Sequence, residues 1–162
     1  MIPFQKLHYR AGAMLLSASC LLVLLCGCSS FNREWRQAGT LPTPEDSIEG
    51  RWEGRWLSDA NGHRGKLLCI VSRDPEGITH AAYFRASYLK VLRFSYTVPL
   101  RVKENAGGWV FQGTEDLGAV AGGVYHYEGS ATATNFLSHY RSQSDHGVFE
   151  MKRPPTKPPV EK

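Results

Sequence analysis

Histidine and glutamate residues in the C-terminal third of this 162-residue chain have the spacing of metal ligands. His126 and Glu128 are two positions apart and therefore share one face of a strand. If Glu128 pairs near Asn135, His139 joins the same face, and two histidines with a carboxylate can ligate zinc. The opposite face of both strands is aromatic and is the natural interior. We therefore expect the histidines to face water, and we expect no metal and no cofactor.

Ser144, Asp145 and His146 supply the residue types of a Ser-His-Asp triad. They are consecutive in a predicted turn, without a Gly-x-Ser-x-Gly elbow or positioned oxyanion donors. The chain also has no Cys-x-x-Cys motif, P-loop or dinucleotide-binding fingerprint. The sequence therefore predicts no catalytic residue and no enzyme.

The N-terminal segment has the three parts of a secretory signal. Residues 1–10 carry Lys6 and Arg10 and no acid, residues 11–25 are apolar, and the small residue Gly27 follows. An apolar stretch of this length spans roughly 22 Å at ~1.5 Å per residue, which is short of the ~30 Å hydrocarbon core. The sequence therefore favours a signal over a transmembrane helix.

Leu25-Cys26-Gly27-Cys28 at the end of this segment resembles the lipobox of bacterial lipoproteins. The resemblance implies cleavage after residue 27 and lipid, palmitate included, on Cys28, which would hold the protein on a membrane of the cell envelope. Ser29 at the next position implies sorting to the outer membrane, on its periplasmic side. An ordinary signal peptide and an uncleaved anchor are the alternatives.

Cys69 is the one free thiol expected after processing, because Cys20 and Cys26 leave with the signal. It lies in the apolar run 67–71, so we expect a buried, unreactive thiol and no intramolecular disulfide. Removal of residues 1–27 takes away two basic residues and no acid, which lowers the formal net charge from +4 to +2. This mild charge argues against nucleic acid as a partner.

The composition divides the chain into four parts. These are a signal peptide (1–27), a flexible polar tether (28–47), one domain able to bury a core (48–153) and a disordered Pro-rich tail (154–162). Helix is expected only in the signal, apart from a single turn at residues 86–89.

The domain is expected to consist of strands. Along residues 48–56, apolar residues and glycines alternate with Glu49, Arg51, Glu53 and Arg55, which is the period of a strand. Comparable segments follow at about 65–73, 78–87, 92–104, 108–113, 121–129, 133–142 and 146–152, separated by turn-forming residues. The sequence thus predicts an all-β fold, a small antiparallel meander barrel of about eight strands. Lys or Arg on a lipid-facing strand costs about 2–4 kcal/mol at mid-membrane, so the charged outward face predicts a soluble barrel.

The interior of an eight-stranded barrel is either filled by side chains or holds one small ligand. The residues expected to point inward are Trp52, Trp56, Phe84, Phe94, Tyr96, Val98, Tyr125, Tyr127, Phe136, Tyr140, Phe149 and Met151. If a small hydrophobic ligand binds, Trp52, Trp56, Tyr125 and Tyr127 are its expected contacts. The many rings and glycines favour the other hypothesis, a packed structural or interaction module with envelope proteins as partners.

Gly50-Arg51-Trp52 resembles the Gly-x-Trp start of the first strand in calycins, the superfamily of lipocalins, fatty-acid-binding proteins and avidins. The resemblance implies a barrel in which a basic residue from late in the chain packs over that tryptophan. Arg141 and Arg153 are the two candidates for this position.

Overall fold

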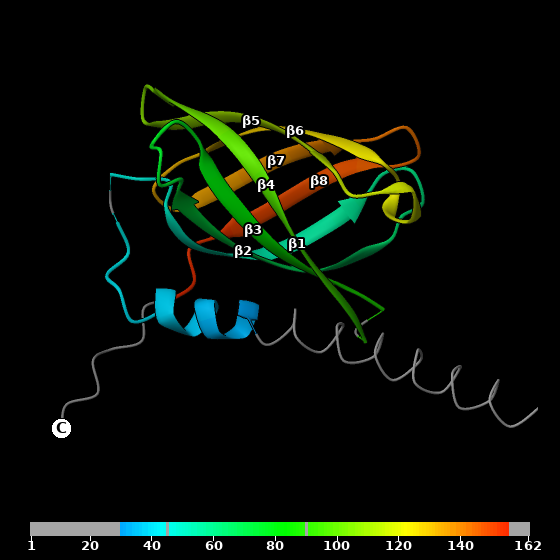
Figure 1. The fold of residues 1–162 in the computed structure, drawn as a ribbon, viewed down its shortest axis with the longest axis horizontal. Coiled ribbons are helices and arrows are strands. Elements are labelled where there is room, and N and C mark those ends of the chain that lie inside the picture. Colours follow the sequence, from blue (N-terminus) through cyan, green and yellow to red (C-terminus); the bar gives the residue numbers. More distant parts are fainter. Residues whose placement is uncertain (1–29, 45, 90, 156–162) are drawn as a thin grey trace, which may run out of the picture.

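The structure is a computed structural model that describes residues 30–44, 46–89 and 91–155. Eight antiparallel strands follow one another and close into a barrel, with β1 paired to both β2 and β8 (Figure 1). The strands are β1 Gly50–Ser58, β2 Arg64–Arg73, β3 His80–Tyr88, β4 Leu92–Asn105, β5 Gly108–Asp116, β6 Val124–Ala131, β7 Asn135–Arg141 and β8 His146–Lys152, with a 3-10 turn η1 at Ala119–Ala121 before β6. The all-β meander predicted from the sequence is confirmed.

Three features predicted from the sequence cannot be followed here. The signal segment, Cys28 and the tail from residue 156 lie outside the described residues. Among the residues that are described, no helix is long and apolar enough to cross a bilayer.

The alternation in β1 places its two tryptophans inside the barrel, as predicted. Trp52 is fully buried and Trp56 nearly so, whereas Arg55 between them is exposed. Glycine is needed on this inward face at residue 54, because a Cβ there would lie 1.9 Å from the carbonyl oxygen of Glu150 on β8. Close approach of β1 to β8 therefore closes the barrel.

Aromatic rings fill the space between the strands. Phe84 lies at the centre, with ring centroids 5.4 Å from both Tyr96 and Phe149. Phe111 stacks on Phe136 at 4.6 Å, and Tyr140 lies 4.9 Å from Phe149. These separations are those of favourable aromatic pairs, so the rings act as core packing.

Phe94 is a correction to the predicted interior, because half of its surface is exposed. It does lie on the inward-facing register, paired with buried Ala86 on β3. Between Leu92 and Pro99, however, β4 pairs with β3 and not with β5, and the β3–β4 hairpin runs past the rim of the barrel (Figure 1). The helical turn expected at 86–89 is also wrong, since β3 continues to Tyr88.

Residues 30–38 form a helix, which corrects the expectation that helix is confined to the signal. Phe31 is fully buried, 4.9 Å from the Tyr83 ring and under the Arg85 guanidinium at 4.5 Å. Trp35 lies farther along, 5.2 Å from the guanidinium of Arg51 on β1. The helix therefore packs on the outer face of β1–β3, where the sequence predicted a flexible tether (Figure 1).

Candidate functional site

One end of the barrel is closed over Trp52. The indole N–H donates to the carbonyl oxygen of Ile48 at 2.9 Å, and the ring packs 5.4 Å from Phe136. Arg153, just after β8, lies 3.8 Å above the Trp52 ring. Its guanidinium also donates to the carbonyl oxygens of Glu49 at 2.5 Å and Ser47 at 2.6 Å. We call Trp52, Arg153, Ser47 and Glu49 the plug, because together they seal this end.

The plug answers the question that the calycin resemblance posed. Arg153 occupies the predicted position over the tryptophan, and Arg141 instead lies exposed on the outer face. Burial lowers the pKa of Arg153 to about 10, so the guanidinium is still charged at neutral pH. A charged group over a buried ring, with two carbonyl acceptors, forms a cation–π contact and charge-assisted hydrogen bonds.

Trp56 lies toward the opposite end of the barrel and makes different contacts. Its indole N–H donates to the carbonyl oxygen of Ser87 at 3.0 Å, and its ring stacks on Tyr88 at 6.2 Å. A Cβ on Gly65 would come within 2.6 Å of the indole nitrogen, so the glycine gives the ring its space. Trp56 thus fastens β1 to the end of β3.

The two predicted tyrosines belong to a ladder on the other wall of the barrel. Tyr125 is half-buried and stacks 6.2 Å from Tyr127, which is buried. Tyr127 in turn lies 6.4 Å from Phe84 and 6.0 Å from Phe149. Burial raises the pKa of Tyr127 and of Tyr96, which keeps both phenols neutral.

The four predicted ligand contacts are therefore not gathered around one pocket. Trp52 is inside the plug, Trp56 is at the other end, and the tyrosines pack on the rings that fill the interior. Two hollows among the described residues lie on the outer face of the barrel. The inward-facing side chains form one hydrophobic core.

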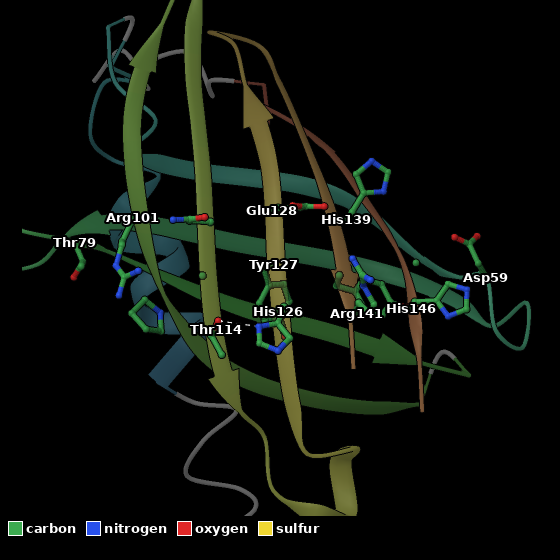
Figure 2. A pocket seen from close by; sticks show the side chains of 15 residues that line it. Asp59, Thr79, Arg101, Thr114, His126, Tyr127, Glu128, His139, Arg141 and His146 are labelled. Atoms are coloured by element: carbon green, nitrogen blue, oxygen red, sulfur yellow. Dashed lines mark hydrogen bonds between the residues drawn. The ribbon is translucent and has the colours of Figure 1, made fainter. Parts of the chain in front are cut away.

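One of these hollows is a shallow groove of about 760 Å³ across the outer face of β4–β8 (Figure 2). Two cross-strand rows of polar residues line it. One row runs Arg101, Gln112, Glu128 and His139, and the other runs Thr114, His126, Arg141 and His146. Thr114 and His126 share a hydrogen bond of 3.2 Å, drawn in Figure 2. We call this surface the polar groove.

The strand pairing beneath the polar groove gives the positions of the expected histidine cluster. Glu128 pairs with His139 rather than with Asn135, which pairs with Lys152 on β8. His126, Glu128 and His139 are exposed, as predicted for a face that points to water. Within the part of the chain that the structure describes, no three candidate ligands come together for a metal ion.

The Ser144-Asp145-His146 run does not form a triad. Asp145 accepts a hydrogen bond from the Ser58 hydroxyl at 2.6 Å and one from Tyr140 at 3.5 Å. His146 is exposed on the outer face and pairs with Arg141. The carboxylate thus ties the β7–β8 turn to the end of β1. The pKa of Tyr140 is raised, mainly by burial and further by the Asp145 charge and the hydrogen bond between Tyr140 and Asp145.

Cys69 is fully buried between Trp52 on β1 and Phe84 on β3 in the register of the sheet, and burial raises the pKa of its thiol. The prediction of an unreactive core thiol agrees with this environment. Sequence reasoning missed two features, the docked helix and the polar groove. The apolar pair Phe31 and Trp35, one helical turn apart, was a signal for the first. The second needed the register of five strands, which alternation alone does not supply.

Comparison with known proteins adds no relative to this description. No family model, curated protein or solved structure matches the chain.

Proposed function

We propose that this protein is a lipid-anchored lipoprotein of the bacterial cell envelope, with a calycin-like barrel that works as a packed structural or interaction module and not as an enzyme. The observation that carries the second half is the filled interior. Trp52, Phe84 and Phe136 are each at most 2% exposed, and five other buried rings belong to the same core: Trp56, Phe111, Tyr127, Tyr140 and Phe149. A module of this kind acts through its surface.

The same contacts disfavour the alternative, a binder of a small hydrophobic ligand. A ligand at the predicted contacts would have to displace the Arg153 guanidinium from Trp52 or the Tyr88 ring from Trp56. Either change breaks packing that the barrel itself uses, and a site that must first be emptied binds weakly.

A dye titration tests the packed barrel. Full-length protein is titrated with a fatty acid and with a hydrophobic fluorescent dye while tryptophan emission is followed. We expect no saturable change at high micromolar ligand. Saturable quenching that disappears in Trp52→Ala, with the barrel still folded by circular dichroism, would favour the binder instead.

The lipid anchor is supported by the lipobox-like run that ends at Cys28 and by the structure that follows it. The first described residue, Ser30, already contacts the barrel through a 3.1 Å hydrogen bond to the Tyr83 hydroxyl. An anchor at residue 28 would therefore hold the barrel close to the bilayer, with little intervening chain.

Metabolic labelling tests the anchor. Cells expressing the full chain are fed an alkyne-tagged palmitate and then fractionated. We expect label on the wild-type protein in the membrane fraction, and loss of both label and membrane retention in Cys28→Ala. A Cys69→Ala variant is the matched control and should keep the label. Membrane retention of an unlabelled wild-type chain would contradict the anchor.

The polar groove supports a surface role. The helix covers the outer face of β1–β3, whereas the outer face of β4–β8 carries exposed residues of both charges, among them Arg101, Arg141 and Glu128. We propose that an envelope partner uses this uncovered face. In this proposal the protein is attached to the membrane by another part of the chain, the lipid on Cys28.

A further inference from the structure

The apolar end of the β3–β4 hairpin is the feature that the proposed module does not use. Leu89 is 69% exposed, Val91 80% and Leu92 59%, and Phe94 is half exposed. These four residues, here called the apolar tip, come from one short turn and its flanks. Single exposed apolar residues are ordinary, but four together in a projecting turn mark a contact surface.

The sheet itself makes the hairpin project. Paired positions between β4 and β5 start at Leu100, opposite Gly113. From Leu92 to Pro99, β4 pairs with β3. Pro99 lies at the point of separation and has no N–H to offer a neighbour. The β4 edge of the hairpin is therefore unpaired from Leu92 to Pro99, whereas β3 stays paired with β2 as far as Ala86. The turn of the hairpin extends past the barrel rim, on the side that carries the helix (Figure 1).

The surroundings of the apolar tip carry only positive charge along the two strands that form it and along β2. No aspartate or glutamate occurs between Glu76 and Glu104, or between Asp59 and Asp74. Arg93 at the base of the turn is exposed, as are Arg64 and Lys66 on the adjoining end of β2. Exposed apolar residues with basic residues on the same and the adjoining strand match an anionic phospholipid surface, where phosphates sit above acyl chains.

The start of the described chain lies against β3, one strand of the same hairpin. Residues 30–32 contact Tyr83 and Arg85 of β3 through the Ser30 hydroxyl, the Phe31 ring and the Asn32 side chain. Leu89 is four residues beyond Arg85, or roughly 13 Å along a strand. Cys28 is two residues before Ser30 and can be at most about 7 Å from it. A lipid on residue 28 would therefore be attached within a short length of chain from the apolar tip.

We propose that the apolar tip inserts into the interface of an anionic bilayer beside the lipid on Cys28, so that the barrel has a fixed orientation on the membrane. The proximity step rests on the proposed anchor, and the exposure and charge of the hairpin do not. In this orientation β3 and the helix face the bilayer, and the polar groove on β4–β8 is left for a partner.

Lipid quenching of an added tryptophan tests the insertion. Val91→Trp and Ile78→Trp are prepared in the full chain and mixed with phosphatidylglycerol-containing vesicles whose acyl chains are brominated. Ile78 is the matched control, because it is 78% exposed but lies in the β2–β3 loop at the plug end. We expect strong quenching of the Val91→Trp emission beyond that of the parent protein, and none for Ile78→Trp.

Equal quenching of the two variants would overturn the proposal. So would shielding of Val91→Trp by a second copy of the chain, seen as a dimer in sedimentation with no quenching by brominated lipid. Circular dichroism confirms that each variant keeps the barrel.

The anchor and the insertion fail in different ways. Palmitate on Cys28 with no quenching at Val91→Trp leaves the anchor intact and overturns the insertion. Quenching at Val91→Trp without palmitate, repeated in a Cys28→Ala background, supports the insertion and removes the anchor. A phosphatidylcholine arm tests the charge, and we expect quenching to fall by about twofold or more there.

Discussion

The two ends of the barrel treat the same kind of residue in opposite ways. At the plug end an aromatic ring, Trp52, is fully buried under Arg153. At the hairpin end the ring of Phe94, on the same inward register, is half exposed. Both ends combine apolar side chains with arginine, yet one is sealed and the other is open to its surroundings.

The difference teaches where this protein places stability and where it places contact. Arg153 contacts two main-chain carbonyl oxygens and the Trp52 ring, so its guanidinium interacts within the molecule. Arg93 and the apolar tip have no such closure from the barrel, since β4 has left β5 at that end. Substitutions at the plug should therefore damage the fold, and substitutions at the tip should spare it.

The largest expected effect comes from the plug tryptophan. Trp52→Ala removes a fully buried ring and should lower the free energy of unfolding by about 3–5 kcal/mol. Trp56→Ala should cost less, because Trp56 is 8% exposed at the rim and water can enter the space it leaves. Urea denaturation followed by circular dichroism measures both. An equal or larger loss for Trp56→Ala would contradict the ranking of the two ends.

Removal of the plug arginine comes next. Arg153→Ala takes a charged donor away from the Ser47 and Glu49 carbonyls and uncovers Trp52, which should cost about 1–3 kcal/mol of stability. Arg141→Ala, on the exposed polar groove, is the matched control and should change stability by less than about 0.5 kcal/mol. Similar losses in both variants would mean that the plug does not act as a closure.

High pH should destabilise the barrel, because buried tyrosines ionise. Burial raises the pKa of Tyr96, Tyr127 and Tyr140, so the folded state keeps these phenols neutral while the unfolded chain ionises near pH 10. Their contribution is fully present below about pH 10 and is lost as the pH rises above it. The melting temperature should fall in that range, together with a rise in tyrosinate absorbance. Tyr127→Phe should make the fall shallower, and an unchanged pH profile would count against burial of this phenol.

The smallest effect on stability is expected at the apolar tip. Val91→Asp and Ile78→Asp both replace exposed side chains, and each should change the free energy of unfolding by less than about 0.5 kcal/mol. Only Val91→Asp should weaken vesicle binding. A large loss of stability in Val91→Asp would show that the tip packs on the molecule and is not available to a membrane.

Most strands could be predicted from the sequence, because the alternation of apolar and polar residues is a local property of the chain. The segments expected near 65–73, 92–104 and 146–152 match β2, β4 and β8 to within about one residue. Inward residues follow from the same period, and the calycin resemblance singled out Arg153 as one of two candidates over Trp52.

The features that were predicted wrongly or missed depend on contacts between segments that are distant in the sequence. The exposure of Phe94 depends on where β5 leaves β4, and the pairing of Glu128 with His139 depends on the length of the β6–β7 turn. The helix at residues 30–38 is stabilised by Tyr83 and Arg85, which lie far along the chain. None of these is encoded within a single window of the sequence.

The indole N–H groups offer the most direct test of a packed interior. Each of the four tryptophans gives one signal in a two-dimensional NMR spectrum, and those of Trp52 and Trp56 report the bonds to Ile48 and Ser87. We expect both signals to stay in place, and to stay protected from solvent exchange, as a fatty acid is added to the full chain. Saturable shifts of both signals would contradict the packed module and establish a ligand site inside the barrel.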